Sequence, residues 1–271
     1  MREGRVSKPR PDLSVIPIRE AQPILSAWIR PRIPLKLIHT HEKISDADLL
    51  ALAILRYLHK MPYFSRWWHF LKVEVRFVLP SLTQAHVRLK RLLPVLETLL
   101  NEVESLDFAL IDSEPIPVCR FKRAKHCKFP QASFGFTTQG MIYGFKLHAW
   151  ALPNGRIVRY LIRPAHEHDL NAGEQMNADW PTYGGPKIIG DKAYVGGGYI
   201  TPPKTNARYP DLRWRDEYHA ARKAIESAFS SVAGRGLRWG QVKTIWGLRL
   251  KVALVLIAYN LRFQNFGPVN P

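Results

Sequence analysis

Two short apolar segments of this sequence each lead directly into an aspartate. Phe108–Ile111 is followed by Asp112, and Lys187–Gly190 is followed by Asp191. Short apolar runs between polar boundaries are typical of buried strands. Because functional sites of α/β proteins lie where strands end, these two runs predict a pair of carboxylates at one edge of a sheet.

The segments around the two runs predict the rest of an α/β domain. Tyr143–Trp150 and Arg156–Ile162 alternate in the manner of strands, and Pro153-Asn154-Gly155 between them indicates a hairpin turn. Further elements are expected in this order: a helix capped by Asp169, an extended segment at Tyr199–Thr201, and helices over Arg215–Val232 and Ile245–Phe263. This order predicts a mixed sheet flanked by helices.

A third candidate acid, Glu226, lies in the first of the two later helices. Residues three and four apart share a helix face, so Arg215, His219, Arg222 and Glu226 form one stripe. Three carboxylates could hold two divalent metal ions for phosphodiester cleavage, with Mg²⁺ favoured by oxygen ligands, while the cations of the stripe bind phosphates. The alternative is simpler: each aspartate caps a turn, and Arg222 and Glu226 form an ordinary ion pair.

The formal net charge of +18 over 271 residues indicates a polyanionic partner, above all nucleic acid. A ribosome-associated protein, or one that is merely basic, is the alternative. One basic segment without any acid lies between the predicted strands, and its candidate DNA contacts are Arg120, Lys122 and Arg123. The longest apolar run, Val252–Tyr259, is too short to cross a bilayer and predicts a buried helix, so no membrane partner is expected.

The first hundred residues differ in character from the rest. Residues 1–43 are rich in proline and arginine and predict a loose basic arm. Residues 44–104 predict short helices, with Ser45 and Ser81 as N-terminal caps. This region suits a helix-turn-helix arrangement, although any small helical bundle looks similar. Its third helix, expected over Leu82–Leu93, offers these candidate DNA contacts: Gln84, Arg88, Lys90 and Arg91.

Several motifs together resemble the DDE transposases of bacterial insertion sequences. They occur in this order: Ile111-Asp112-Ser113 with Pro115-Ile116-Pro117, Tyr143-Gly144-Phe145-Lys146, His168-Asp169, Gly190-Asp191-Lys192-Ala193-Tyr194, and Arg222 with Glu226 four residues later. The resemblance covers about residues 44–265. It implies an RNase H-like catalytic domain, here over residues 105–266, preceded by the small all-α region.

The resemblance also implies a mechanism and its residues. Asp112, Asp191 and Glu226 correspond to the catalytic, metal-binding triad, with two Mg²⁺ ions for which Mn²⁺ substitutes. Lys192 and Tyr194 are candidate phosphate contacts. Two positions depart from the family: His219 stands where many relatives have tyrosine, and Ala233 stands where they have lysine, with Arg235 nearby as a substitute.

The expected partners are double-stranded transposon ends with terminal inverted repeats and target DNA, bound by a homodimer or higher oligomer. The expected location is the bacterial cytoplasm, in association with the nucleoid. Two alternatives remain open for the function. The protein could be a nuclease of the same fold that cuts without joining, or a non-catalytic DNA-binding repressor derived from a transposase.

Overall fold

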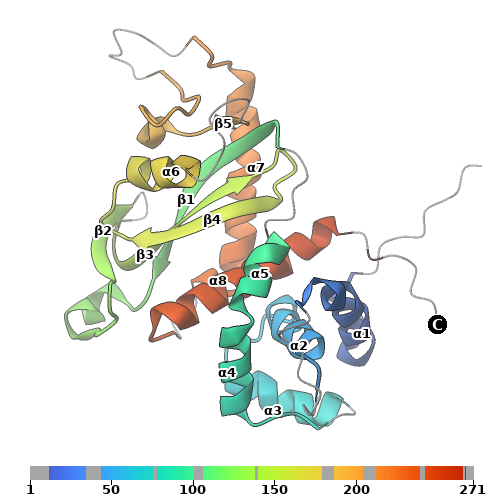
Figure 1. Cartoon of the computed structure of the whole chain (residues 1–271). Coiled ribbons are helices and arrows are strands. Elements are labelled where there is room, and N and C mark those ends of the chain that lie inside the picture. The colour runs from blue at the N-terminus through green and yellow to red at the C-terminus, as the bar shows by residue number, and fades with distance from the viewer. Residues whose placement is uncertain are drawn as a thin grey trace, which may run out of the picture.

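The computed structural model describes residues 12–34, 44–75, 78–100, 106–137, 140–178, 186–203, 212–238, 242–264 and 266. Five strands form one sheet (Figure 1): β1 (Phe108–Pro117), β2 (Ser133–Thr137), β3 (Gly140–Ala151), β4 (Ile157–Pro164) and β5 (Lys187–Ile189). β3 is antiparallel to β1, β2 and β4, whereas β5 is parallel to β1. The mixed sheet predicted from the sequence is therefore confirmed.

Two details of the sheet decide where the candidate aspartates lie. β1 does not end at Asp112 but continues to Pro117, so Asp112 is an internal strand residue. The parallel pairing of β1 with β5 covers only Phe108 to Leu110, the last pair being Leu110 with Ile189. Asp112 and Asp191 each follow that pair by two residues, and both therefore lie just beyond the end of β5. The extended segment expected near residue 200 appears as a single parallel bridge between Ile189 and Ile200.

Helices cover both faces of the sheet (Figure 1): α6 (Asp169–Ala178) lies on one face, and α7 (Glu217–Val232) and α8 (Ile245–Asn260) lie on the other. The alternation of side chains along a strand explains the two layers. Ala109 and Ile111 of β1 pack in the smaller core that includes Met176 of α6. Leu110, between them, joins the larger core with residues of α7 and α8.

The region before the sheet is helical, as predicted. It contains α1 (Ile18–Ile29), α2 (Asp46–Leu58), α3 (Phe64–Glu74), α4 (Leu82–Arg91) and α5 (Leu93–Leu100). Both predicted caps are present: Ser45 Oγ accepts a hydrogen bond from the Asp48 amide, and Ser81 forms a capping box with Gln84. The helix expected over Leu82–Leu93 ends at Arg91, and a separate helix, α5, begins at Leu93.

Helix α1 corrects the expectation of a loose arm over residues 1–43. Its buried residues Ile18, Ala21, Leu25 and Ile29 recur at helical spacing and join the large core. The proline and arginine content concealed this periodicity, and Pro23 itself lies inside the helix. The remaining parts of the predicted arm, residues 1–11 and 35–43, are outside the described residues.

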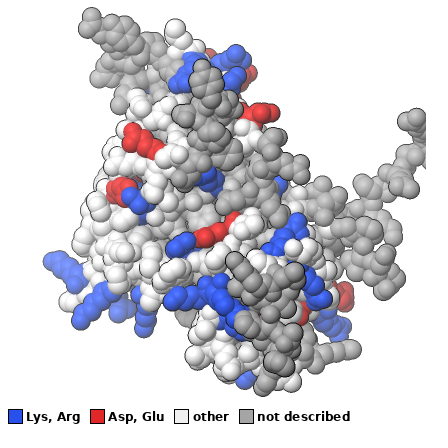
Figure 2. All heavy atoms as spheres, in the orientation of Figure 1, with Lys and Arg blue, Asp and Glu red and all other residues white. Residues whose placement is uncertain are grey.

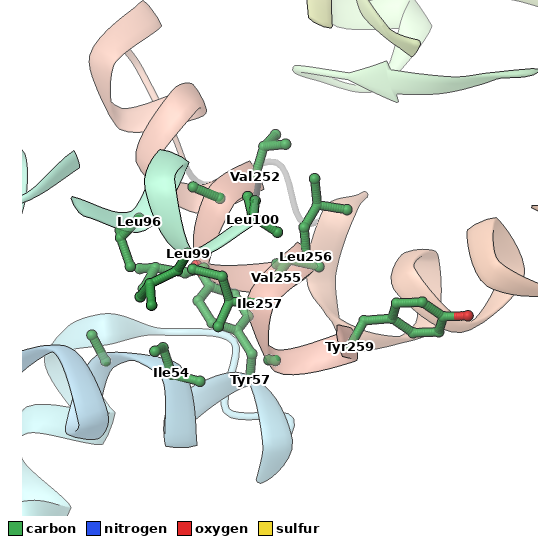
Figure 3. Close-up of a cluster of buried hydrophobic side chains, with 14 of the residues drawn as sticks. Ile54, Tyr57, Leu96, Leu99, Leu100, Val252, Val255, Leu256, Ile257 and Tyr259 are labelled. Atoms are coloured by element: carbon green, nitrogen blue, oxygen red, sulfur yellow. The ribbon is translucent and has the colours of Figure 1, made fainter. Parts of the chain in front are cut away.

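Helix α8 joins the N-terminal helices to the sheet. Ile54 and Tyr57 of α2, the leucines of α5 and the apolar side chains of α8 belong to one core, which Figure 3 shows in close-up. The same core continues into Leu147 and Ala149 of β3. The buried helix predicted for the apolar run is thus confirmed, and the boundary predicted at residues 104–105 does not interrupt the core. Across the described ranges, no helix is long and apolar enough to span a membrane.

Candidate active site

Three elements bring the predicted acids to one cavity of about 960 Å³. Asp112 lies opposite Ala149 of β3, and its side chain therefore points to the sheet face that α7 covers. Asp191 follows β5 and accepts a hydrogen bond of 2.9 Å from the Ala193 amide. Glu226 reaches the same cavity from α7. The expectation that these three acids share one site thus agrees with their placement.

The carboxylates are close enough to affect one another. Burial, foremost, and the negative charges of Asp191 and Glu226 raise the pKa of Asp112 to about 7. The Ser113 amide, 2.8 Å from Asp112 Oδ1, and the Arg222 guanidinium act in the opposite direction. Asp112 is therefore a largely buried carboxylate that its two acidic neighbours repel.

The donor set fits hard divalent cations in its chemistry and its charge. Carboxylate oxygens are the ligands that Mg²⁺ prefers, and a cation would offset the repulsion that Asp112 experiences. Within the described ranges, however, no three His, Cys, Asp or Glu side chains are gathered tightly enough to hold one ion. Glu226 has 56% of its side chain exposed and lies at the rim of the cavity.

Arg222 lies between two of the acids. Its Nη2 atom is 3.6 Å from Asp112 Oδ2 and 3.8 Å from Glu226 Oε1, distances longer than a good hydrogen bond. Its Nε atom is buried without a hydrogen-bond partner among the described residues. Arg222 also lines an adjoining cavity of about 460 Å³ together with Asp191, Lys192 and His219. The guanidinium thus retains unused donors where two cavities meet.

A second network supports Asp112 from the opposite face of β1. Lys146 of β3 donates to Asp169 Oδ1 at 2.7 Å, and Ser113 Oγ donates to Asp169 Oδ2 at 3.1 Å. Both members of the Lys146–Asp169 pair are largely buried. Because the Ser113 amide is bonded to Asp112, this network fixes the strand at the acid. Lys146 and Asp169 both belong to the sequence motifs, but the motifs did not predict that they pair with each other.

Glu114 and Arg238 form another contact that the sequence did not reveal. Arg238 donates two hydrogen bonds, of 2.8 and 2.6 Å, to Glu114 Oε1. Arg238 follows the segment Ala233–Leu237 at the end of α7, where Gly236 has a φ of 123°. The pair connects β1, which carries Asp112, to the segment after α7, which carries Glu226. No local pattern predicts a partner 124 residues away.

Several predicted DNA contacts are not available for that role. Tyr194 is fully buried, and its hydroxyl is 3.1 Å from His148 Nδ1, so it cannot reach a phosphate. Arg235 does not replace the family lysine at the acids, because it lines a separate cavity with Asp12 and Arg262. Arg215 is exposed beside Glu217, outside the residues that line the site cavity.

The predicted contacts on α4 also require correction. Arg88 has 11% of its side chain exposed and donates two hydrogen bonds to Asp46 Oδ1, at 3.0 and 2.6 Å. Arg91 pairs with the other carboxylate oxygen of Asp46 at 3.1 Å, and Gln84 caps its own helix. Of the four residues proposed on this helix, Lys90 alone is exposed without such a bond to a described residue, and its ammonium lies 5.2 Å from the Trp246 ring.

The basic segment before β2 is exposed as expected. Arg120, Lys122 and Arg123 lie at the short helix η3 (Phe121–His126). In Figure 2, Lys and Arg atoms gather at the lower left, where Figure 1 places this segment below β2. This surface is therefore available to a polyanion.

Comparison with known families identifies the segment that carries the two aspartates. Residues 102–204 match the family model described as the transposase DDE domain. The match includes β1 to β5 with Asp112 and Asp191, whereas Glu226 lies beyond it. Comparisons with curated proteins and with solved structures return no match. The match and the strand order together confirm the RNase H-like sheet predicted from the sequence.

Proposed function

Since residues 102–204 of this chain match the transposase DDE domain, we propose that it binds the ends of an insertion sequence, cleaves their strands and joins the 3′-hydroxyl ends to target DNA. One observation carries the proposal: Asp112, Asp191 and Glu226 reach a single cavity from a strand, a strand end and a helix. The motif resemblance assigned the triad to the same residues.

The three acids would hold two divalent ions, Mg²⁺ or Mn²⁺, which supply an activated nucleophilic oxygen and a stabilised leaving oxygen. Asp112 is fixed by the Ser113 amide, and Asp191 by the Ala193 amide. Arg222 and Lys192 would bind the phosphates on either side of the scissile bond. The same residues would serve cleavage and joining, because both steps are phosphoryl transfers that differ only in the nucleophile.

The partner would be double-stranded DNA, bound by a homodimer or higher oligomer in the bacterial cytoplasm. The net charge of +18 supports this partner. The exposed cations Arg120, Lys122, Arg123 and Lys90 are available for its backbone.

The test uses the full chain and the DNA that flanks its gene. Duplexes with candidate terminal repeats, intact or pre-cut, are incubated with Mg²⁺, Mn²⁺ or EDTA. We expect nicked ends and joined products in both metals and none in EDTA. Cleavage without joined products from pre-cut ends would identify a nuclease instead. Binding without any metal-dependent product would identify a repressor.

Arg222 offers a separate prediction. Its ion pairs are long, so we expect Arg222→Lys to leave the melting temperature unchanged. Lysine lacks the planar fork that grips a phosphate in two places, and strand cleavage should therefore fall about tenfold, which corresponds to about 1.4 kcal/mol of transition-state stabilisation. Single-turnover cleavage beside thermal unfolding measures both. Wild-type cleavage by a well-folded variant would show that Arg222 serves only as an ion-pair partner.

A further inference from the structure

The hairpin formed by β2 and β3 exposes an aromatic surface that the catalytic proposal does not use. Phe134 and Phe136 of β2 lie opposite Tyr143 and Met141 of β3, respectively, so all four side chains share one face. We call these four residues the hairpin platform. Phe136 is 76% exposed, Phe134 44% and Met141 46%. Large apolar side chains exposed together on one surface indicate a binding site.

The platform is rigid because the other side of β2 is packed. A Cβ atom at Gly135 would lie 2.1 Å from the Ala165 carbonyl oxygen, so β2 rests directly on the backbone after β4. Ser133 Oγ accepts a hydrogen bond of 3.0 Å from the His166 amide. On the exposed side, the Phe134 ring lies 4.9 Å from the Tyr143 ring and 5.9 Å from Phe121 of η3, which is itself 52% exposed.

Positive charge borders the platform. Arg120, Lys122, Arg123, Lys125 and Lys128 are all exposed, and residues 118–137 contain no acid. None of these five cations forms a salt bridge with a described residue. Exposed aromatic rings bordered by such cations are the combination that binds unpaired nucleotides, since bases stack on the rings and the cations hold the phosphates.

The platform also continues into the candidate active site. Tyr143 and Phe145 point to the same face of the sheet, and the register pairs Phe145 with Ile116, on the same face as Asp112 and Glu114. Phe136 and Thr137 line the cavity that contains Asp112, Asp191 and Glu226. A single strand of DNA that leaves this cavity along β2 would cross the exposed rings before it reaches the basic segment at η3.

We propose that the hairpin platform and the basic segment at η3 form a binding site for unpaired DNA, which holds a separated single strand next to the cavity. The rings of Phe134 and Phe136 stack on bases without selecting their sequence. Lys122 and Arg123 contact the backbone of the same strand. This site deepens the proposed transposase function, on which its biological meaning rests, but strand binding itself requires no metal and no cleavage.

The test measures binding by the full chain in EDTA, so its outcome does not depend on catalysis. The probes are a fluorescein-labelled oligothymidylate, a duplex of equal length, and a single strand that contains 2-aminopurine. We expect Phe134→Ala and Phe136→Ala each to weaken single-strand binding about tenfold and duplex binding far less. Quenching of 2-aminopurine should fall in parallel, whereas Phe136→Trp should restore it. Phe70→Ala is the matched control, because Phe70 is an exposed phenylalanine of α3 with 42% exposure.

Salt dependence separates the two parts of the site. Lys122→Gln with Arg123→Gln should lower the slope of log affinity against log salt by about 0.7 for each phosphate that the variant no longer neutralises. The alanine variants at the rings should keep the wild-type slope. Unchanged single-strand binding by both alanine variants, or equal weakening of single-strand and duplex binding, would overturn the proposal. If these variants instead bound anionic phospholipid vesicles less well, with single-strand binding intact, the surface would be assigned to lipid.

Discussion

Asp112→Asn is expected to lower metal-dependent strand cleavage by roughly a thousandfold, which corresponds to about 4 kcal/mol of transition-state stabilisation. Asn keeps the size of the side chain but removes the charge that would hold a divalent cation. Asp191→Asn and Glu226→Gln should have effects of the same order, because each acid reaches the same cavity. Single-turnover cleavage of an end duplex measures the loss.

These variants should lose the negative charge of the carboxylate and keep the fold. Asp112 is largely buried among other acids, and an uncharged amide is easier to bury than a carboxylate. We therefore expect Asp112→Asn to unfold at or above the wild-type temperature and to bind duplex DNA normally in a gel shift. Glu174→Gln is the matched control, since Glu174 is an exposed acid of α6 that does not line the cavity. Near wild-type cleavage by any of the three variants would remove that residue from the triad.

The sequence predicted the elements whose signals are local. Apolar runs marked the strands that carry Asp112 and Asp191, Pro153-Asn154-Gly155 marked the β3–β4 turn, and the two serines marked the helix starts. The order of these elements, together with the motifs, was sufficient for an RNase H-like sheet. The strand-end signal located Asp191 after β5, whereas β1 continues past Asp112 to Pro117, so Asp112 reaches the cavity from within a strand.

The hairpin platform was not predicted, because a strand usually buries its large apolar side chains and β2 exposes them. β2 is not an apolar run with a buried face of large side chains. Its phenylalanines point outward, and the inward position is Gly135, where a close backbone contact leaves no room for a side chain. The alternation of large and small side chains in Ser133–Thr137 is visible in the sequence. Which of the two sides faces solvent is decided by the backbone at Ala165, which lies against Gly135.

Charged residues were assigned least reliably, because charge alone does not distinguish a DNA contact from a structural ion pair. Nothing local distinguishes Lys146 and Arg238 in the sequence, yet each is paired with an acid beside the cavity. Arg88 and Arg91 looked like contacts for DNA on an exposed helix face. Their partner, Asp46, lies more than forty positions earlier in the chain, as separations of 42 and 45 residues show. Tertiary pairing at this range has no sequence signature.

The pairing at Asp46 leads to the second large effect. Asp46 begins α2, has 4% of its side chain exposed, and accepts hydrogen bonds from both Arg88 and Arg91. Removal of one partner of a buried pair leaves an uncompensated charge, which typically costs 3–5 kcal/mol. We expect Asp46→Ala to lower the free energy of unfolding by roughly 3–5 kcal/mol, measured by urea denaturation.

Comparison of variants on α4 then separates stability from DNA recognition. Arg88→Ala should also be strongly destabilising, and the double variant with Asp46→Ala should lose clearly less than the sum of the two single losses, because both remove the same interaction. Lys90→Gln, on the exposed side of α4, should change stability by less than about 0.5 kcal/mol and weaken duplex binding. If Arg88→Ala instead kept its stability and lost selective binding to the transposon ends, Arg88 would be a DNA contact after all. The ion pair with Asp46 predicts the opposite outcome, since Arg88 already donates from Nε and Nη2 to the buried Asp46 carboxylate and to the Ile44 carbonyl.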